Sequence, residues 1–75
     1  MEVTVVGLGY VGLTAAAVMA NIGHEVLGVE KNQTRLAKLM AGESGILEPG
    51  LDEMLVDGLR SGRLRLTHVD HVAKE

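Results

Sequence analysis

The sequence predicts an α/β fold built on a parallel sheet. Short segments rich in β-branched residues, 2–6 and 25–30, alternate with longer apolar segments that have helical spacing. A glycine run with the spacing G-x-G-x-x-G, from Gly7 to Gly12, joins the first strand to the first helix. This combination is typical of the Rossmann doubly wound parallel sheet. The 75 residues suffice for its first half (β-α-β-α-α-β), in which right-handed crossovers give the sheet order third, second, first strand.

The glycine run allows a sharp turn to lie close to a negatively charged ligand. Gly7 has no Cβ to forbid the backbone angles of a steep strand-to-helix turn. Gly9 lacks the side chain that would collide with a pyrophosphate approaching the free N–H groups of the helix start. Gly12 lets the helix lie close against the strand. The run therefore predicts a dinucleotide site, but the pattern alone is weakly specific and depends on its context.

The segment from 2 to 30 supplies that context. Residues 2–6 read as a short buried strand, and residues 10–22 read as an alanine-rich helix that Gly23 ends. Residues 25–30 read as a second strand. The apolar helix has about thirteen residues, whereas a membrane span needs roughly 20. We therefore expect no membrane partner.

Glu30 gives the strongest support for a dinucleotide site. It lies eighteen residues after Gly12, at the end of the second predicted strand. An acid at this place accepts hydrogen bonds from the adenosine ribose hydroxyls, and it repels a 2′-phosphate. The cofactor expected is therefore NAD rather than NADP. The alternative is a solvated carboxylate at a strand end.

Two helices separated by a glycine-rich loop are expected next. Asn32 caps a helix that ends at Gly42. In the loop 42–50, Pro49 suits the first turn of the following helix, and Glu48 complements that helix's positive end.

The last part of the chain predicts a helix, a strand and the start of another helix. The first helix ends at Gly62 and contains Gly58, which costs about 1 kcal/mol relative to alanine. Residues 63–67 alternate like a half-exposed strand. Asp70 then caps a further helix.

Composition excludes several other functions. The net charge of −3, with no basic cluster, gives no reason to expect a nucleic-acid partner or an anionic membrane surface. The chain has no cysteine, so it holds no disulfide, thiolate metal site or cysteine nucleophile. His68 and His71 could share a helix face, but a metal needs further ligands, and we expect surface histidines instead. The amino terminus reads as a cytoplasmic start without a signal peptide.

Several motifs together resemble the amino-terminal end of the UDP-glucose/GDP-mannose 6-dehydrogenase family. Nearly all of the chain takes part in this resemblance. The motifs are Gly7-Leu8-Gly9-Tyr10-Val11-Gly12, Gly23-His24-Glu25-Val26, Gly28-Val29-Glu30, Gly42-Glu43-Ser44, Glu48-Pro49-Gly50-Leu51 and Ser61-Gly62-Arg63-Leu64. The combination of G-L-G-Y-V-G with a later E-P-G-L makes the resemblance specific to this family. Two positions depart from the family pattern: Glu30 stands where Asp is usual, and Gly45 stands where Pro is usual.

The resemblance implies the oxidation of a nucleotide sugar, from C6 alcohol to carboxylate, with two NAD molecules. The family's catalytic cysteine and lysine lie downstream, so no catalytic residue carries over to this chain. The cofactor residues carry over. Tyr10 and Val11 offer backbone amides near the pyrophosphate within the glycine run, Glu30 lies at the ribose, and Arg35 matches a basic position that approaches the same ribose. For Arg35 a solvated charged face is an equal alternative.

Two other functions remain open from the sequence. One is the NAD-binding part of a different Rossmann dehydrogenase, which the E-P-G-L segment argues against. The other is a non-catalytic nucleotide-binding or assembly module. We also expect residues 1–75 to be the amino-terminal part of a dinucleotide-binding domain, without the substrate and catalytic domains. Its first strand would then leave an open edge at residues 2–6 and favour a homo-oligomer.

Overall fold

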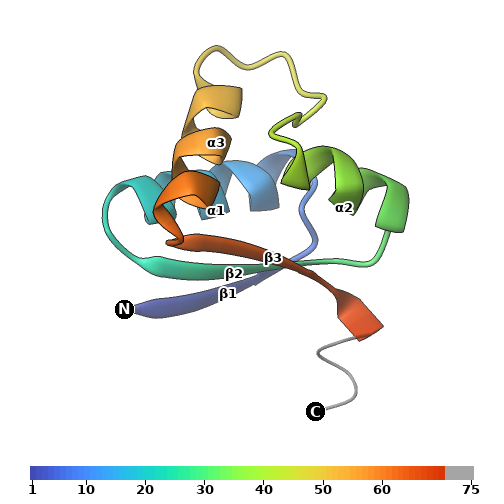
Figure 1. Cartoon of the computed structure of the whole chain (residues 1–75), viewed down its shortest axis with the longest axis horizontal. Helices are drawn as coiled ribbons and strands as arrows, with labels where there is room; N and C mark the ends of the chain where they lie inside the picture. The colour runs from blue at the N-terminus through green and yellow to red at the C-terminus, as the bar shows by residue number, and fades with distance from the viewer. Residues whose placement is uncertain (71–75) are drawn as a thin grey trace.

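Three helices pack on one face of a three-stranded parallel sheet (Figure 1). The computed structural model describes residues 1–70. The elements are β1 (Glu2–Val6), α1 (Tyr10–Asn21), β2 (Glu25–Glu30), α2 (Gln33–Met40), α3 (Leu51–Ser61) and β3 (Leu64–His68). Their order confirms the predicted α/β arrangement, the first half of a Rossmann sheet.

The sheet brings the carboxyl ends of its strands to one edge. Its order is β1-β2-β3 with both pairs parallel, as predicted. Val6 pairs with Val29, and Glu30 pairs with His68. The Gly7 N–H donates to the Val29 carbonyl at 2.8 Å, so the pairing continues one residue beyond β1. The chain therefore leaves the sheet for α1 directly beside the end of β2.

Aliphatic side chains fill the space between the helices and the sheet. The fully buried residues from the helices and β3 are Leu13, Ala16, Ala17, Ala20, Leu39, Leu51, Leu55 and Leu64. Gly58 lets α3 come close to its neighbours, because a Cβ there would lie 3.0 Å from the Leu64 Cβ and 3.5 Å from the Ala20 Cβ. The glycine that the sequence marks only as a helix cost is thus a packing position. None of the helices in residues 1–70 has the length and apolar character needed to cross a membrane.

Most of the predicted helix boundaries are confirmed. Gly23, Gly42 and Gly62 have φ values of 111°, 85° and 80° and follow the three helices. The Asn32 Oδ1 accepts a hydrogen bond from the Arg35 N–H at 2.9 Å, which is the expected cap of α2.

The predicted place of Pro49 in the first turn of a helix is wrong, whereas the charge role of Glu48 stays a prediction. Helix α3 begins at Leu51, after Gly50 with φ 85° and ψ −10°. The Leu51 N–H donates to the Glu48 carbonyl at 3.1 Å. These angles and this bond define a type II turn, with proline at its second position and glycine at its third. The E-P-G-L motif is therefore a turn that precedes α3, and Glu48 lies outside the helix.

Two predictions near the end of the chain also change. Strand β3 begins at Leu64, one residue later than expected. Val69 and Asp70 already have helical conformation, so Asp70 does not cap the helix from outside. The rest of that predicted helix, including His71, lies outside the described residues.

Strand β1 forms an edge of the sheet. Within residues 1–70 it pairs with β2 and with no other strand. Thr4 is exposed, and the Val6 side chain is 75% exposed. The open edge expected from the sequence is therefore present in the described part of the chain.

Candidate functional site

The glycine turn, residues 7–12, has the geometry that its spacing predicts. Gly7 has φ 86°, a left-handed conformation that side chains disfavour. A Cβ on Gly12 would lie 2.0 Å from the Gly7 carbonyl oxygen, so α1 and the end of β1 are in direct backbone contact. A Cβ on Gly9 would meet no atom within 4 Å among residues 1–70, its two chain neighbours aside. The open space at Gly9 lies where the sequence expects a phosphate.

Tyr10 and Val11 form the first turn of α1 beside that space. The intrahelical ladder starts with the Leu13 N–H donating to the Gly9 carbonyl at 2.8 Å. The preceding amides have no acceptor within the helix, and they carry its positive end. The Tyr10 and Val11 side chains are 53% and 78% exposed. Their place in the structure is therefore the one from which main-chain amides could bind an anion.

Glu30 lies at the end of β2 and holds the glycine turn. Its side chain is only 7% exposed. The Leu8 N–H donates to Oε1 and the Asn32 N–H donates to Oε2, each at 3.0 Å. Burial raises the pKa of the Glu30 carboxyl, but these hydrogen bonds and the charge of Arg35 outweigh burial and lower it. Glu30 is therefore a carboxylate at neutral pH.

Leu8 anchors the turn to the sheet through its side chain. It is fully buried, and it packs over Gly28 of β2. A Cβ on Gly28 would lie 3.0 Å from the Leu8 Cδ1. Nothing in the sequence marks Leu8 for this role, because an apolar residue inside a glycine run is not a signal of its own.

Arg35 binds main-chain carbonyls rather than lying free on the surface. Its Nε and Nη2 donate to the Leu8 carbonyl at 2.9 and 2.7 Å, and its Nη1 donates to the Ser44 carbonyl at 3.1 Å. The alternative of a solvated charged face is therefore wrong. A guanidinium has five N–H groups, so these three bonds leave two for a ligand. Contact between Arg35 and a ribose stays a prediction.

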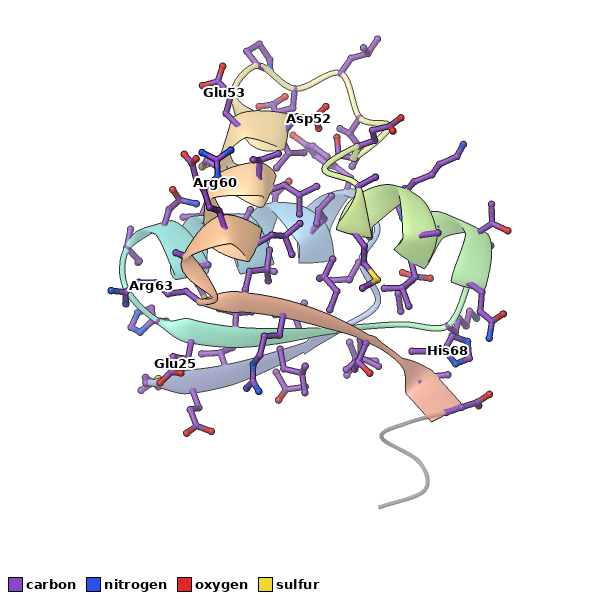
Figure 2. All side chains as sticks on the ribbon, viewed as in Figure 1. Glu25, Asp52, Glu53, Arg60, Arg63 and His68 are labelled. Atoms are coloured by element: carbon purple, nitrogen blue, oxygen red, sulfur yellow. The ribbon has the colours of Figure 1, made fainter. Side chains whose placement is uncertain are left out.

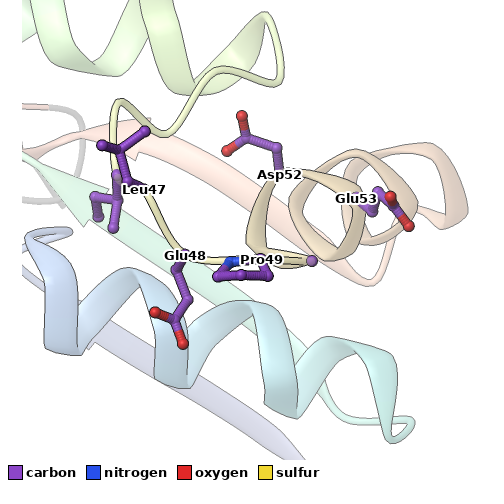
Figure 3. Close-up of a pocket in the computed structure, with 7 residues that line it drawn as sticks. Leu47, Glu48, Pro49, Asp52 and Glu53 are labelled. Atoms are coloured by element: carbon purple, nitrogen blue, oxygen red, sulfur yellow. The ribbon is translucent and has the colours of Figure 1, made fainter.

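Of the predicted cofactor residues, Gly7 and Glu30 line a pocket of about 250 Å³ at the carboxyl edge of the sheet, and the other five do not line it. Its lining residues are Val6, Gly7, Val29, Glu30, Lys31 and Val69. A larger pocket of about 400 Å³ lies over the 46–53 segment, where Figure 3 shows Glu48, Pro49 and Asp52. The larger pocket contains none of the predicted cofactor residues. We assign the site to the smaller one because the glycine turn and the strand-end acid both reach it.

The histidine at the end of β3 has partners of its own. The His68 Nε2 lies 2.9 Å from the Lys31 carbonyl, and its Nδ1 accepts from the Asp70 N–H at 3.2 Å. Both ring nitrogens are thus engaged. Within residues 1–70 no three potential ligand side chains come together in a metal-binding group. His71, the other histidine considered, lies outside the described residues.

A parallel sheet that carries a glycine turn and a buried acid at its carboxyl edge defines a dinucleotide-binding domain. The open space at Gly9 and the acceptor oxygens of Glu30 fit the pyrophosphate and ribose of such a cofactor. Residues 1–75 match the model of the UDP-glucose/GDP-mannose dehydrogenase family, NAD binding domain. The chain belongs to this family, and its cofactor is NAD.

Relatives of known activity are similar over most of this chain. GDP-mannose 6-dehydrogenase of Azotobacter vinelandii is 43% identical over 67 residues, and UDP-glucose 6-dehydrogenase of Rhizobium meliloti is 40% identical over 67 residues. Each comparison covers 89% of this chain and 15% of the relative. The chain thus spans only a small amino-terminal share of these enzymes.

A solved structure shows the same fold. The ternary complex of GDP-mannose dehydrogenase from Pseudomonas aeruginosa is 42% identical, with a TM-score of 0.84 over 89% of this chain and 15% of that one. The UDP-glucose dehydrogenase of Pyrobaculum islandicum is 44% identical, with a TM-score of 0.82 over 88% of this chain and 15% of that one. Both confirm the partial Rossmann fold.

Proposed function

We propose that this chain provides the NAD site of a nucleotide-sugar 6-dehydrogenase. In that enzyme, of the UDP-glucose or GDP-mannose type, a sugar C6 alcohol would be oxidised to a carboxylate with two NAD molecules. Two contacts between the glycine turn and Glu30 carry the proposal: Gly7 and Glu30 line one pocket, and the Leu8 N–H donates to the Glu30 carboxylate. The relatives' names supply the substrate class. A cytoplasmic location is proposed from the sequence alone.

Residues 1–75 would then form the amino-terminal part of the dinucleotide-binding domain. The nucleotide sugar would contact other parts of the protein, and no catalytic residue is assigned in this chain. Bound NAD supplies the hydride acceptor of the reaction. The chain's own contribution is to bind and orient that cofactor, so residues 1–75 alone would bind NAD without catalysing the oxidation.

The roles proposed for individual residues follow from their positions. Gly9 leaves room for the pyrophosphate, and the Tyr10 and Val11 amides face an anion there. Gly7 and Gly12 make the turn itself possible. Glu30 accepts hydrogen bonds from the ribose hydroxyls, since each of its oxygens has a lone pair beyond the bonds to Leu8 and Asn32. Arg35 lies behind the turn and approaches the same ribose with its remaining N–H groups.

Calorimetric titration of the folded chain tests the cofactor assignment. We expect NAD to bind and NADP to bind at least tenfold more weakly, because the Glu30 carboxylate repels a 2′-phosphate. ATP serves as the control for a site that accepts any nucleotide. Equal affinity for all three would favour a general nucleotide-binding module. No NAD binding by a folded sample would contradict the proposed function.

We also propose that the chain self-associates along β1. The strand has an exposed side and pairs only with β2 in residues 1–70, and an open edge of this kind can accept another strand. Sedimentation equilibrium should give an average mass that rises with concentration. Thr4→Lys adds a charge at this edge and should shift the equilibrium toward monomer. A monomeric mass for the unaltered chain at all concentrations would count against association.

A further inference from the structure

A chain of hydrogen bonds connects the first turn of α3 with the glycine turn. The Asp52 Oδ1 accepts from the Ser44 N–H at 3.1 Å. The Ser44 carbonyl accepts from Arg35, whose other two donor nitrogens hold the Leu8 carbonyl. The path thus passes from α3 through the 42–50 loop and α2 to the turn, without entering the cofactor pocket.

Ser44 connects Asp52 with Arg35 through its main-chain N–H and carbonyl. It is 1% exposed, and its hydroxyl accepts from the Ile46 N–H at 3.1 Å. The next residue, Gly45, has φ 73°, a conformation that proline, with φ near −65°, cannot adopt. The loop therefore takes its own backbone path here, where the family usually has proline. With this backbone conformation, the Ser44 N–H donates to Asp52, and the Ser44 carbonyl accepts from Arg35.

The Leu8 carbonyl matters because it belongs to the same peptide unit as the Gly9 N–H. A trans peptide is planar, so its C=O and N–H point in opposite directions. When Arg35 holds the Leu8 carbonyl on one side, the Gly9 N–H is directed to the other side. A Cβ on Gly9 would meet no atom of the described residues within 4 Å apart from its chain neighbours, so a phosphate has room at this residue. Arg35 thereby fixes the direction of one donor of the proposed anion site.

The preceding peptide unit is fixed in a similar way. The Leu8 N–H donates to Glu30, and the carbonyl of the same unit belongs to Gly7. That carbonyl faces Gly12, where a side chain would lie 2.0 Å from it. Two consecutive peptide units of the glycine turn are therefore oriented by charged side chains from β2 and α2.

We propose that Asp52 is a positioning residue for the NAD site, acting through the Ser44 main chain and Arg35. The inference rests on the proposed function, because it concerns the donors of that same site. Asp52 lies on the side of α3 that faces the 42–50 loop, whereas the neighbouring Glu53 points away from it (Figures 2 and 3). Only Asp52 of these two acids has a hydrogen bond to the loop among the described residues.

Asp52→Ala and Glu53→Ala form a matched pair for the test. Both remove an acid from the first turn of α3, so both lose the same favourable charge at the helix start. Only Asp52→Ala also removes the acceptor of the Ser44 N–H. We expect Asp52→Ala to raise the Kd for NAD roughly three- to tenfold, and Glu53→Ala to leave it within about twofold. Asp52→Asn keeps an oxygen acceptor and should restore most of the affinity.

A second measurement compares the same variants in the absence of NAD. Nuclear magnetic resonance of the folded chain reports the Gly9 and Ser44 amides individually. Asp52→Ala should shift both signals and speed both exchange rates, whereas Glu53→Ala should leave them unchanged. A purely structural role of Asp52 would speed exchange throughout the sheet instead. If the unaltered chain does not bind NAD, the proposed function fails, and the Gly9 signal alone decides the positioning role.

Equal effects of the two alanine variants on NAD affinity and on the Gly9 amide would overturn the inference. So would a loss of affinity in Asp52→Asn as large as in Asp52→Ala, since the hydrogen bond would then not be the cause. If Asp52→Ala fails to fold, Asp52→Leu is compared with Glu53→Leu by the same two measurements, because leucine favours helix and also removes the acceptor of the Ser44 N–H. An unchanged Gly9 signal in the aspartate variant, with an unchanged Ser44 signal, would then contradict the path.

Discussion

Gly12→Ala should remove a large part of the stability of this chain. The new Cβ would lie 2.0 Å from the Gly7 carbonyl oxygen and 3.2 Å from its carbonyl carbon. Both are backbone atoms, so α1 would have to move away from β1. Overpacking of this kind costs about 1–3 kcal/mol, and more where backbone must shift. A domain of this size has a free energy of unfolding of only roughly 4–11 kcal/mol, at 0.05–0.15 kcal/mol per residue. Urea unfolding followed by circular dichroism measures the loss.

Gly9→Ala is the matched control for stability. It adds the same methyl group to the same turn, but that group would meet no atom within 4 Å. Gly9 has an extended conformation, with φ −73°, that alanine adopts readily. Its free energy of unfolding should fall by less than about 1 kcal/mol, the usual cost of alanine at a helix cap. Equal urea midpoints for Gly12→Ala and the unaltered chain would contradict the close strand–helix contact.

Gly9→Val should abolish NAD binding while the chain stays folded. The extended backbone at Gly9 suits valine, and a Cβ there would meet no atom of the described residues within 4 Å apart from its chain neighbours. That space is where we place the pyrophosphate, so the branched side chain would exclude it from the amides of the α1 start. We expect calorimetry to show at least a hundredfold loss of affinity, about 2.7 kcal/mol.

Ala15→Val is the control for added bulk on α1. Ala15 is exposed on the same helix, outside the glycine turn. The control variant should bind NAD as the unaltered chain does. Tight NAD binding by a folded Gly9→Val sample would mean that the pyrophosphate lies elsewhere, even if the chain binds the cofactor.

The sequence predicted the parts of the site that depend on local backbone chemistry. Glycine spacing after a β-branched strand indicated the turn, and the distance from Gly12 to Glu30 indicated the acid at the next strand end. The same local logic failed at Pro49, because proline suits both a helix start and the second position of a type II turn. Gly50, the next residue, has a left-handed φ of 85°, and this angle is the one that the third position of a type II turn requires.

Contacts between distant segments could not be predicted in the same way. Arg35 reaches Leu8 across 27 positions of the sequence, and Ser44 meets Asp52 across eight. Neither pair has a spacing that marks it, since arginine, serine and aspartate are common on solvated loops. Which carbonyl a guanidinium binds depends on how α2 sits over the glycine turn. Only the folded chain determines that geometry.

The exposure of Tyr10 has a spectroscopic consequence. The chain contains one tyrosine and no tryptophan, so ultraviolet-excited protein emission comes from a single ring. That ring belongs to the first turn of α1, is half exposed, and lies next to Gly9. Fluorescence of the unaltered chain is therefore a local signal from the glycine turn, and it needs no introduced label.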